Sequence, residues 1–191
     1  MVADTGAALD DLGDGDLAVL AMAGRQAAYR VLLDRHRALV FRIARNHCGD
    51  DDAALDITQQ SFVSAFAALA RYDRARPFPH WLARITLNKC HDHARRRRVR
   101  DFFTFARPLD EAAGIAAPQV PADTQLADAQ DLRRAMAAIA RLPDRLKEVL
   151  VLRTLESMSQ NAVADLLGIS GKAVETRLYR AREKLAELLR D

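Results

Sequence analysis

Residues 159–189 read SQNAVADLLGISGKAVETRLYRAREKLAELL, and this stretch predicts the fold of the C-terminal half of the chain. Ser159 suits the cap of a short helix ending at Leu167, because a serine hydroxyl accepts a hydrogen bond from the first backbone N–H groups of a helix. Gly168 supplies the left-handed conformation that closes a helix, and Ser170 can cap the next one. Two short amphipathic helices joined by a tight glycine-bearing turn are typical of a helix-turn-helix.

The second helix of this pair divides into two faces. Five apolar residues recur at helical spacing and are expected to face the core: Val174, Leu178, Ala181, Leu185 and Leu188. The other side carries the residues that we predict to contact DNA: Lys172, Glu175, Thr176, Arg177, Tyr179, Arg180 and Arg182. A recognition helix presents such residues to base edges in the major groove. The alternative is an ordinary charged face in solvent, which the preceding turn disfavours.

The first half of the chain predicts three long helices. Apolar residues recur at helical spacing over residues 25–48, 52–71 and 79–100. Pro77 and Pro79 separate the last two, because proline cannot continue a helix interior. Half of the 191 residues are hydrophobic and only 6% are aromatic, a composition that favours helices over sheets. The sequence therefore predicts an all-α protein.

A segment rich in proline, alanine and acidic residues separates the two helical halves. Residues 108–124 read PLDEAAGIAAPQVPADT and have no helical period, which is typical of an extended or loosely ordered linker. We predict four parts in consequence. They are a flexible acidic N-terminus over residues 1–15, a helical domain over 16–100, an acidic Pro/Ala linker over 101–125, and a four-helix domain over 126–191.

Positive charge is concentrated in a few places, although the formal net charge is only +3. Residues 1–24 contain aspartates and no base, whereas Arg95 to Arg98 form an unbroken basic run followed by Arg100. Such a run favours contact with the phosphates of a nucleic acid. The alternative is a helix end that faces solvent and binds nothing.

No apolar run reaches the roughly 20 residues that a membrane span needs. The N-terminus also lacks the basic start and apolar stretch of a signal peptide. We therefore expect a cytoplasmic protein with no membrane insertion of its own. Two cysteines are too few for a disulfide framework, which agrees with that location.

Thiol and imidazole groups near the ends of two predicted helices raise the question of a metal. The residues concerned are His47, Cys48, Cys90, His91 and His93. Their spacing does not match the short repeats that hold zinc, so we expect neither a metal site nor a cofactor. A nucleophile–base constellation and a glycine-rich phosphate loop are also missing, so the sequence does not predict an enzyme.

Three stretches resemble bacterial sigma factors. Residues 142–185 resemble region 4, the part that reads the −35 promoter element. ALDITQQSF, residues 54–62, resembles the core-polymerase-binding motif of region 2. FPHWLARITLNKCHDHARRRR, residues 78–98, resembles the stretch of region 2 that reads the −10 element and opens the strands.

The resemblance covers about residues 16–100 and 126–190 and leaves no room for a folded middle domain. This layout resembles that of the extracytoplasmic-function (ECF) group. It implies a protein that binds core RNA polymerase, directs it to promoter DNA of stress-response genes, and is held by an anti-sigma factor. The implied polymerase-binding residues are Asp56, Gln59 and Gln60. The implied −10 and melting residues are Trp81, Asn88, Asp92, Arg95, Arg96 and Arg97.

This chain departs from the family pattern at residues of the polymerase-binding motif and of the recognition helix. Leu55 and Gln60 stand where the family usually has acids, which affects the polymerase-binding motif. In the recognition helix, Lys172, Ala173 and Glu175 stand where glycine, threonine and a base are commoner. We therefore carry over no consensus promoter sequence.

Three alternatives stay open at this point. Trp81 could be a plain core residue, because tryptophan is usually well buried. The acidic linker could be a spacer without a binding role. The chain could also be a free-standing helix-turn-helix regulator, although such a protein has no use for a polymerase-binding motif.

Overall fold

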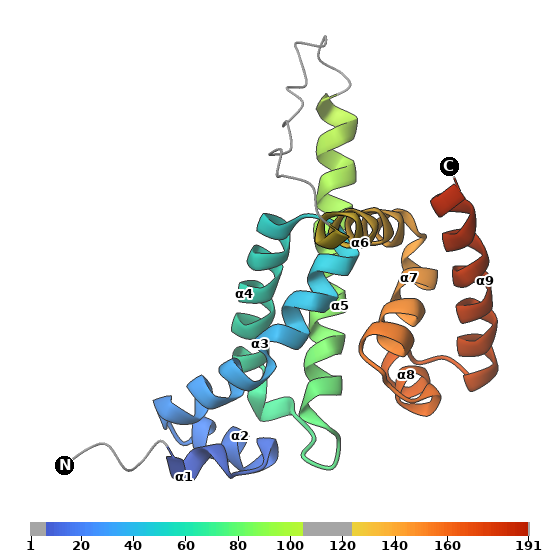
Figure 1. Cartoon of the computed structure of the whole chain (residues 1–191). Helices are drawn as coiled ribbons and strands as arrows, with labels where there is room; N and C mark the ends of the chain where they lie inside the picture. The colour runs from blue at the N-terminus through green and yellow to red at the C-terminus, as the bar shows by residue number, and fades with distance from the viewer. Residues whose placement is uncertain (1–6, 105–123, 191) are drawn as a thin grey trace.

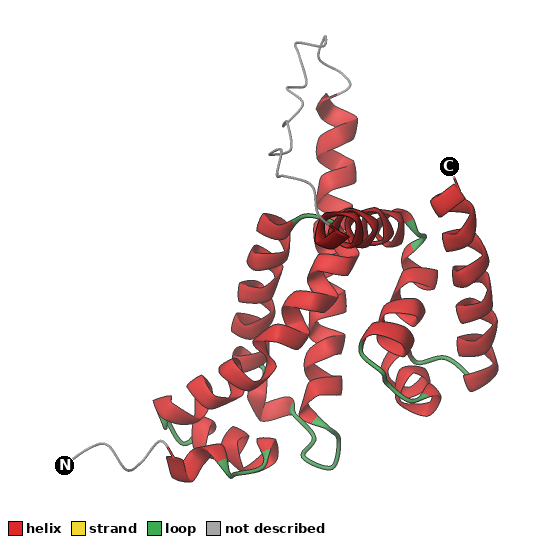
Figure 2. Ribbon diagram, in the orientation of Figure 1, coloured by secondary structure: helices red, strands yellow, loops and turns green. Residues whose placement is uncertain are grey.

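The computed structural model describes residues 7–104 and 124–190, and every regular element in these ranges is a helix (Figure 2). The predicted all-α class is confirmed. The helices form two groups, one from each half of the chain, as predicted (Figure 1). Within the described ranges, no helix is both long and apolar enough to cross a membrane.

Residues 7–104 of the N-terminal domain form five α-helices. They are α1 (Ala7–Asp10), α2 (Asp14–Met22), α3 (Gln26–Cys48), α4 (Asp51–Ala67) and α5 (Phe78–Thr104), with the short 3₁₀ helix η1 (Leu69–Arg71) after α4. Helices α3, α4 and α5 pack against one another, and α2 covers one end of α3 (Figure 1). Their core is aliphatic and aromatic and includes Leu32, Phe62 and Leu82.

The three predicted long helices are present, with altered ends. The predicted helix over residues 52–71 stops at Ala67 and continues as a 3₁₀ turn. The third helix runs on to Thr104, into the segment assigned to the linker. Residues 105–123, which make up most of the predicted linker, lie outside the described residues, and the last two positions of that linker, Thr124 and Gln125, begin a helix of the C-terminal domain.

The predicted flexible tail over residues 1–15 differs from the structure. Residues from Ala7 onward belong to α1 and α2, and Leu9 is buried in the core. The Asp14 carboxylate accepts a hydrogen bond of 2.6 Å from Arg35 and lies 2.9 Å from Nε2 of His36. The acidic charges that suggested a solvated tail are thus partly engaged by α3. Residues 1–6 lie outside the described residues.

The C-terminal domain contains the four predicted helices. They are α6 (Thr124–Arg141), α7 (Asp144–Leu150) continued by the π-helical turn η2 (Val151–Leu155), α8 (Gln160–Leu167) and α9 (Gly171–Arg190). The predicted helix-turn-helix corresponds to α8 and α9. Ser159 Oγ accepts from the amide of Ala162 at 3.1 Å, and Gly168 has a φ of 66°. Ser170 Oγ accepts from Ala173 at 3.2 Å, so both predicted caps are confirmed.

The apolar face predicted for α9 also faces the core. Val174 and Ala181 are buried, while Leu178, Leu185 and Leu188 are partly buried against the same cluster. The hydrophobic spacing of 3 and 4 residues thus fixed which side of α9 packs inward.

The two domains share one hydrophobic core, which the sequence did not predict. Ile43 of α3 and Leu87 of α5 pack into the same buried cluster as Ile139, Val149 and Leu152 of the C-terminal domain. Helix α6 packs on α3, and α8 packs on α5 (Figure 1). The domains therefore form one packed body.

We predict that Leu152→Ala lowers the free energy of unfolding by about 2 to 5 kcal/mol, because it leaves a cavity in this shared core. Leu132→Ala is the matched control: Leu132 is 61% exposed, and its truncation should cost no more than about 0.5 kcal/mol. Urea denaturation followed by circular dichroism measures both. Equal effects of the two substitutions would contradict this description of the core.

Candidate nucleic-acid interface

Trp81 lies at the start of α5 and belongs to an aromatic cluster. Its ring centroid is 5.2 Å from that of Tyr72 and 5.4 Å from that of Phe78. The side chain is half-buried, so one part packs on the core and another lines a surface hollow of about 220 Å³. The loop before α5 is closed by a 2.7 Å hydrogen bond from the Tyr72 hydroxyl to the carbonyl of Arg76. The Trp81 side chain is therefore partly packed in the core and partly accessible from the surface.

The polar residues predicted on α5 follow Trp81 along the helix toward its far end. Asn88 is exposed, and Asp92 accepts a hydrogen bond of 3.0 Å from Arg95. Arg95, Arg96 and Arg97 are exposed, and this part of α5 extends beyond the other helices of its domain (Figure 1). The structure thus places the predicted −10 residues along one helix, which becomes increasingly basic and solvent-exposed.

The residues predicted to read the −35 element lie on α9. Six of the seven side chains are exposed: Lys172, Glu175, Thr176, Tyr179, Arg180 and Arg182. Arg177 is half-buried. The Thr176 hydroxyl donates to the carbonyl of Lys172 at 2.9 Å, which leaves its methyl group and oxygen lone pairs for other contacts. Six of the seven predicted residues are therefore solvent-exposed on α9, and Arg177 lies toward the packed side.

Asp56, Gln59 and Gln60 lie on the outer face of α4 and are exposed. Their spacing of three and four residues places them on one side of the helix. Leu55, 52% exposed, and Val63, 70% exposed, flank them, and sequence reasoning missed Val63. Helix α4 packs on α3 and α5 and lies on the side of its domain away from α7–α9 (Figure 1). This face is a mixed polar and apolar surface that the C-terminal domain leaves uncovered.

Polar contacts join the two domains around the shared core. The guanidinium of Arg84 donates to the carbonyl of Leu166 at 2.8 Å. Other pairs between the domains are Arg42–Glu156 at 2.7 Å, Arg98–Asp144 at 3.2 Å, His91–Glu148, and Lys147 donating to the carbonyl of His47 at 3.1 Å. Three of these groups, Arg84, His91 and Arg98, project from α5. The C-terminal domain therefore occupies part of the helix predicted to read the −10 element.

Two neighbouring charged residues of α7, Lys147 and Glu148, are only 4% and 7% exposed. Burial lowers the pKa of Lys147, partly offset by Asp144 at 3.7 Å. The hydrogen bond that His91 donates to the Glu148 carboxylate raises the pKa of His91. Buried charges are costly unless they are paired, so both residues depend on the partners that the N-terminal domain supplies.

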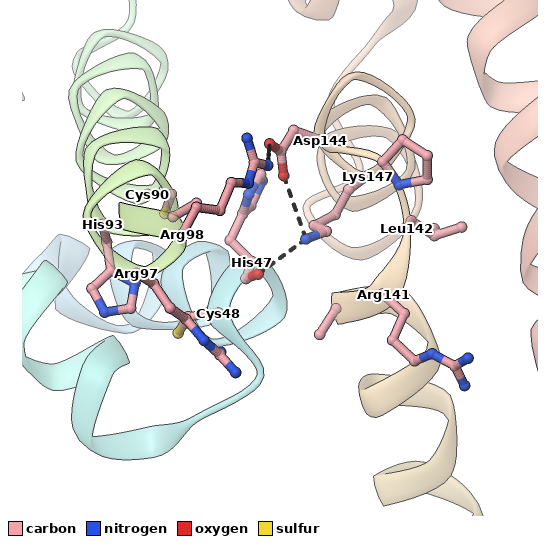
Figure 3. Close-up of a pocket in the computed structure, with 13 residues that line it drawn as sticks. His47, Cys48, Cys90, His93, Arg97, Arg98, Arg141, Leu142, Asp144 and Lys147 are labelled. Carbon is pink, nitrogen blue, oxygen red and sulfur yellow. Dashed lines mark hydrogen bonds and ion pairs between the residues drawn. The ribbon is translucent and has the colours of Figure 1, made fainter. Parts of the chain in front are cut away.

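A cavity of about 390 Å³ lies between the domains, lined by His47, Cys48, Cys90 and His93 on one side and Lys147 on the other (Figure 3). Burial raises the pKa of both thiols, which favours the protonated form that metals bind poorly. In the described parts of the chain, no three His, Cys, Asp or Glu side chains are arranged to hold a metal ion.

His47 gives this interface a pH dependence. Burial, with the nearby charges of Lys147 and His91, lowers the pKa of His47 from 6.5 to about 3. Above pH 6.5 the ring is neutral in both the folded and the unfolded protein. Below this pH only the unfolded chain takes up the proton, so folding loses stability as the pH falls toward the folded pKa.

We predict that this loss reaches about 2 kcal/mol between pH 6.5 and pH 5, at about 1.4 kcal/mol per pH unit. His47→Leu should lack it, since leucine cannot be protonated and Nε2 of His47 has no hydrogen-bond partner to lose. Urea denaturation of both proteins at several pH values measures the difference. The other histidines are common to both proteins and cancel. Parallel pH profiles would contradict the assignment to His47.

Comparison with known proteins agrees with this arrangement. The model of "Sigma-70 region 2" matches residues 32–100, and that of "Sigma-70, region 4" matches residues 132–185. The RNA polymerase sigma factor CnrH of Cupriavidus metallidurans is 39% identical over 179 residues, 92% of this chain and 94% of CnrH. The ECF RNA polymerase sigma factor SigM of Mycobacterium tuberculosis is 30% identical over 178 residues, 92% of this chain and 84% of SigM.

A solved structure of CnrH in complex with the cytosolic domain of CnrY is also similar. It has a TM-score of 0.66 and 35% sequence identity, and the match covers 92% of this chain and 96% of that one. The two halves of this chain are therefore sigma-70 regions 2 and 4, which are parts of a non-catalytic polymerase subunit. The chain belongs to the ECF-type RNA polymerase sigma factors. The predicted resemblance is confirmed, and a free-standing regulator does not account for region 2.

Proposed function

We propose that this sigma factor acts in the cytoplasm at stress-response promoters, with α4 bound to core RNA polymerase and with α5 and α9 on the −10 and −35 elements. The observation that carries this proposal is the uncovered outer face of α4. Asp56, Gln59 and Gln60 are exposed there beside the apolar Leu55 and Val63. An exposed apolar centre with a polar surround suits a protein partner.

The role proposed for α5 is to hold separated strands. Unstacked bases bind to aromatic side chains, while cations follow the backbone. Trp81 offers a partly exposed aromatic ring, and Asn88 and Asp92 offer polar groups further along. Arg95, Arg96 and Arg97 follow and suit phosphates.

The role proposed for α9 is to read duplex DNA. Its residues Lys172, Glu175, Thr176, Tyr179 and Arg180 are exposed near the helix N-terminus, where a recognition helix meets base edges. Arg177 and Arg182 extend this face and suit contacts to base edges or phosphates.

The two domains must separate for both elements to be read at once. The −10 and −35 elements lie about 25 base pairs apart, or about 85 Å along B-DNA at about 34 Å per turn. Helices α5 and α9 cannot span this distance while their domains share one core. We infer that the packed arrangement is the state of the protein before it engages a promoter.

A protein inhibitor is the second partner that we propose. CnrH, 35% identical in its solved structure, is seen there with the cytosolic domain of CnrY. NepR, which forms a complex with the sigma factor RpoE from Bartonella quintana, is named as an anti-sigma factor. An anti-sigma factor that keeps the domains of this chain packed would block promoter binding without altering either DNA-reading helix.

The polymerase contact can be tested with Asp56→Ala/Gln59→Ala. We expect the double variant to lose at least about tenfold in affinity for core polymerase, as interface hot spots do, and to lose run-off transcription in proportion. Asp11→Asn, an exposed position between α1 and α2, is the control and should behave as the unaltered protein does. Unchanged affinity of the double variant, with its fold intact by circular dichroism, would refute the role of α4.

A further inference from the structure

Gln160, the first residue of α8, reaches across the turn to α9. Its side-chain nitrogen Nε2 donates to the carbonyl of Gly171 at 3.0 Å and to Oε1 of Glu175 at 3.1 Å. An amide nitrogen carries two hydrogens, so both are used in these bonds. A side chain from one helix of the pair therefore fixes an exposed carboxylate on the reading face of the other.

Gly171 lies close to the Gln160 amide. A Cβ atom at this position would lie 3.1 Å from Nε2 of Gln160, closer than ordinary van der Waals contact. A larger residue would therefore require the amide to shift by a few tenths of an ångström. With glycine at the first position of α9, the Gln160 amide contacts both the helix backbone and Glu175 without such a shift.

The hydrogen bond from Gln160 holds the Glu175 carboxylate in place and leaves it able to accept further hydrogen bonds. A carboxylate has only acceptor sites, about four of them, and Gln160 uses one on Oε1. The side chain is exposed in the first turns of α9. Holding it in advance removes part of the side-chain entropy that a contact with DNA would otherwise cost.

Base chemistry then decides what such a carboxylate can read. In the major groove, guanine presents the acceptors N7 and O6 and thymine presents the acceptor O4, and these atoms would repel a carboxylate. Adenine presents an amino donor beside the N7 acceptor, whereas the amino group of cytosine is a donor without an adjacent acceptor. A carboxylate therefore favours cytosine.

We propose that Gln160 is a positioning residue that holds Glu175 to read a cytosine within the −35 element. The proposal rests on the function proposed above for α9, and it names the base that this helix selects. Because Glu175 stands where the family commonly has a basic residue, we expect the selected −35 sequence to differ from the one that such relatives select.

The test uses holoenzyme assembled from core polymerase and the full-length chain, with a promoter library randomised over the −35 element. Sequencing of the transcribed promoters gives a preference at each position. We expect the unaltered protein to prefer cytosine at one position by about tenfold. Glu175→Gln should move this preference to adenine, because glutamine pairs with the N6 and N7 atoms of adenine.

Gln160→Ala should reduce the cytosine preference to about threefold, because the carboxylate is no longer held. Preferences at other positions should stay the same, which a general loss of structure would not produce. Gln160→Glu places two carboxylates together and should have at least as large an effect. The control is Glu187→Gln, the same chemical change at an exposed position about three turns further along α9; it should leave every preference unaltered.

The outcomes separate this proposal from the function on which it rests. If the unaltered holoenzyme enriches no −35 sequence, the proposed role of α9 fails. If it enriches a sequence that Glu175→Gln leaves unchanged, that role stands and the reading of cytosine is refuted. If Glu175→Gln changes the preference but Gln160→Ala does not, the positioning role of Gln160 is refuted.

Discussion

The buried contact of Lys147 and Glu148 with the N-terminal domain is the constraint on which this structure depends. Two adjacent charges at 4% and 7% exposure would destabilise the packed arrangement of the two domains if nothing compensated them. Lys147 donates to the last turn of α3, at the carbonyl of His47, and Glu148 contacts His91 of α5. Together with the shared apolar core, these contacts hold the two domains in one orientation.

In this orientation the C-terminal domain covers part of α5 and leaves the outer face of α4 and the outer face of α9 exposed. Arg84, His91 and Arg98 of α5 are engaged by the C-terminal domain. The promoter opening that we propose for α5 would therefore require the release of α7 and α8. An isolated helix-turn-helix has no such requirement.

Sequence reasoning succeeded where the signal is local and failed where it is not. The caps at Ser159 and Ser170 and the apolar face of α9 follow from short-range hydrogen bonding and helical spacing, and the structure has them. Helix α1 was missed because it has four residues and lies in an acidic stretch. The shared core was missed because spacing shows that Ile43 or Val149 is buried but not against which helix. The Gln160–Glu175 bond joins two helices across a turn and needed coordinates to be seen.

The distance between the two domains tests the account most directly. Fluorescent labels at Asp11 and Leu189, both exposed, would report it by single-molecule energy transfer. We predict one narrow distribution of distances in the free protein and an increase on the order of tens of Å when the protein, bound to polymerase, engages promoter DNA, since the two elements lie about 85 Å apart. The same distance in both states, or separated domains in the free protein, would contradict the account.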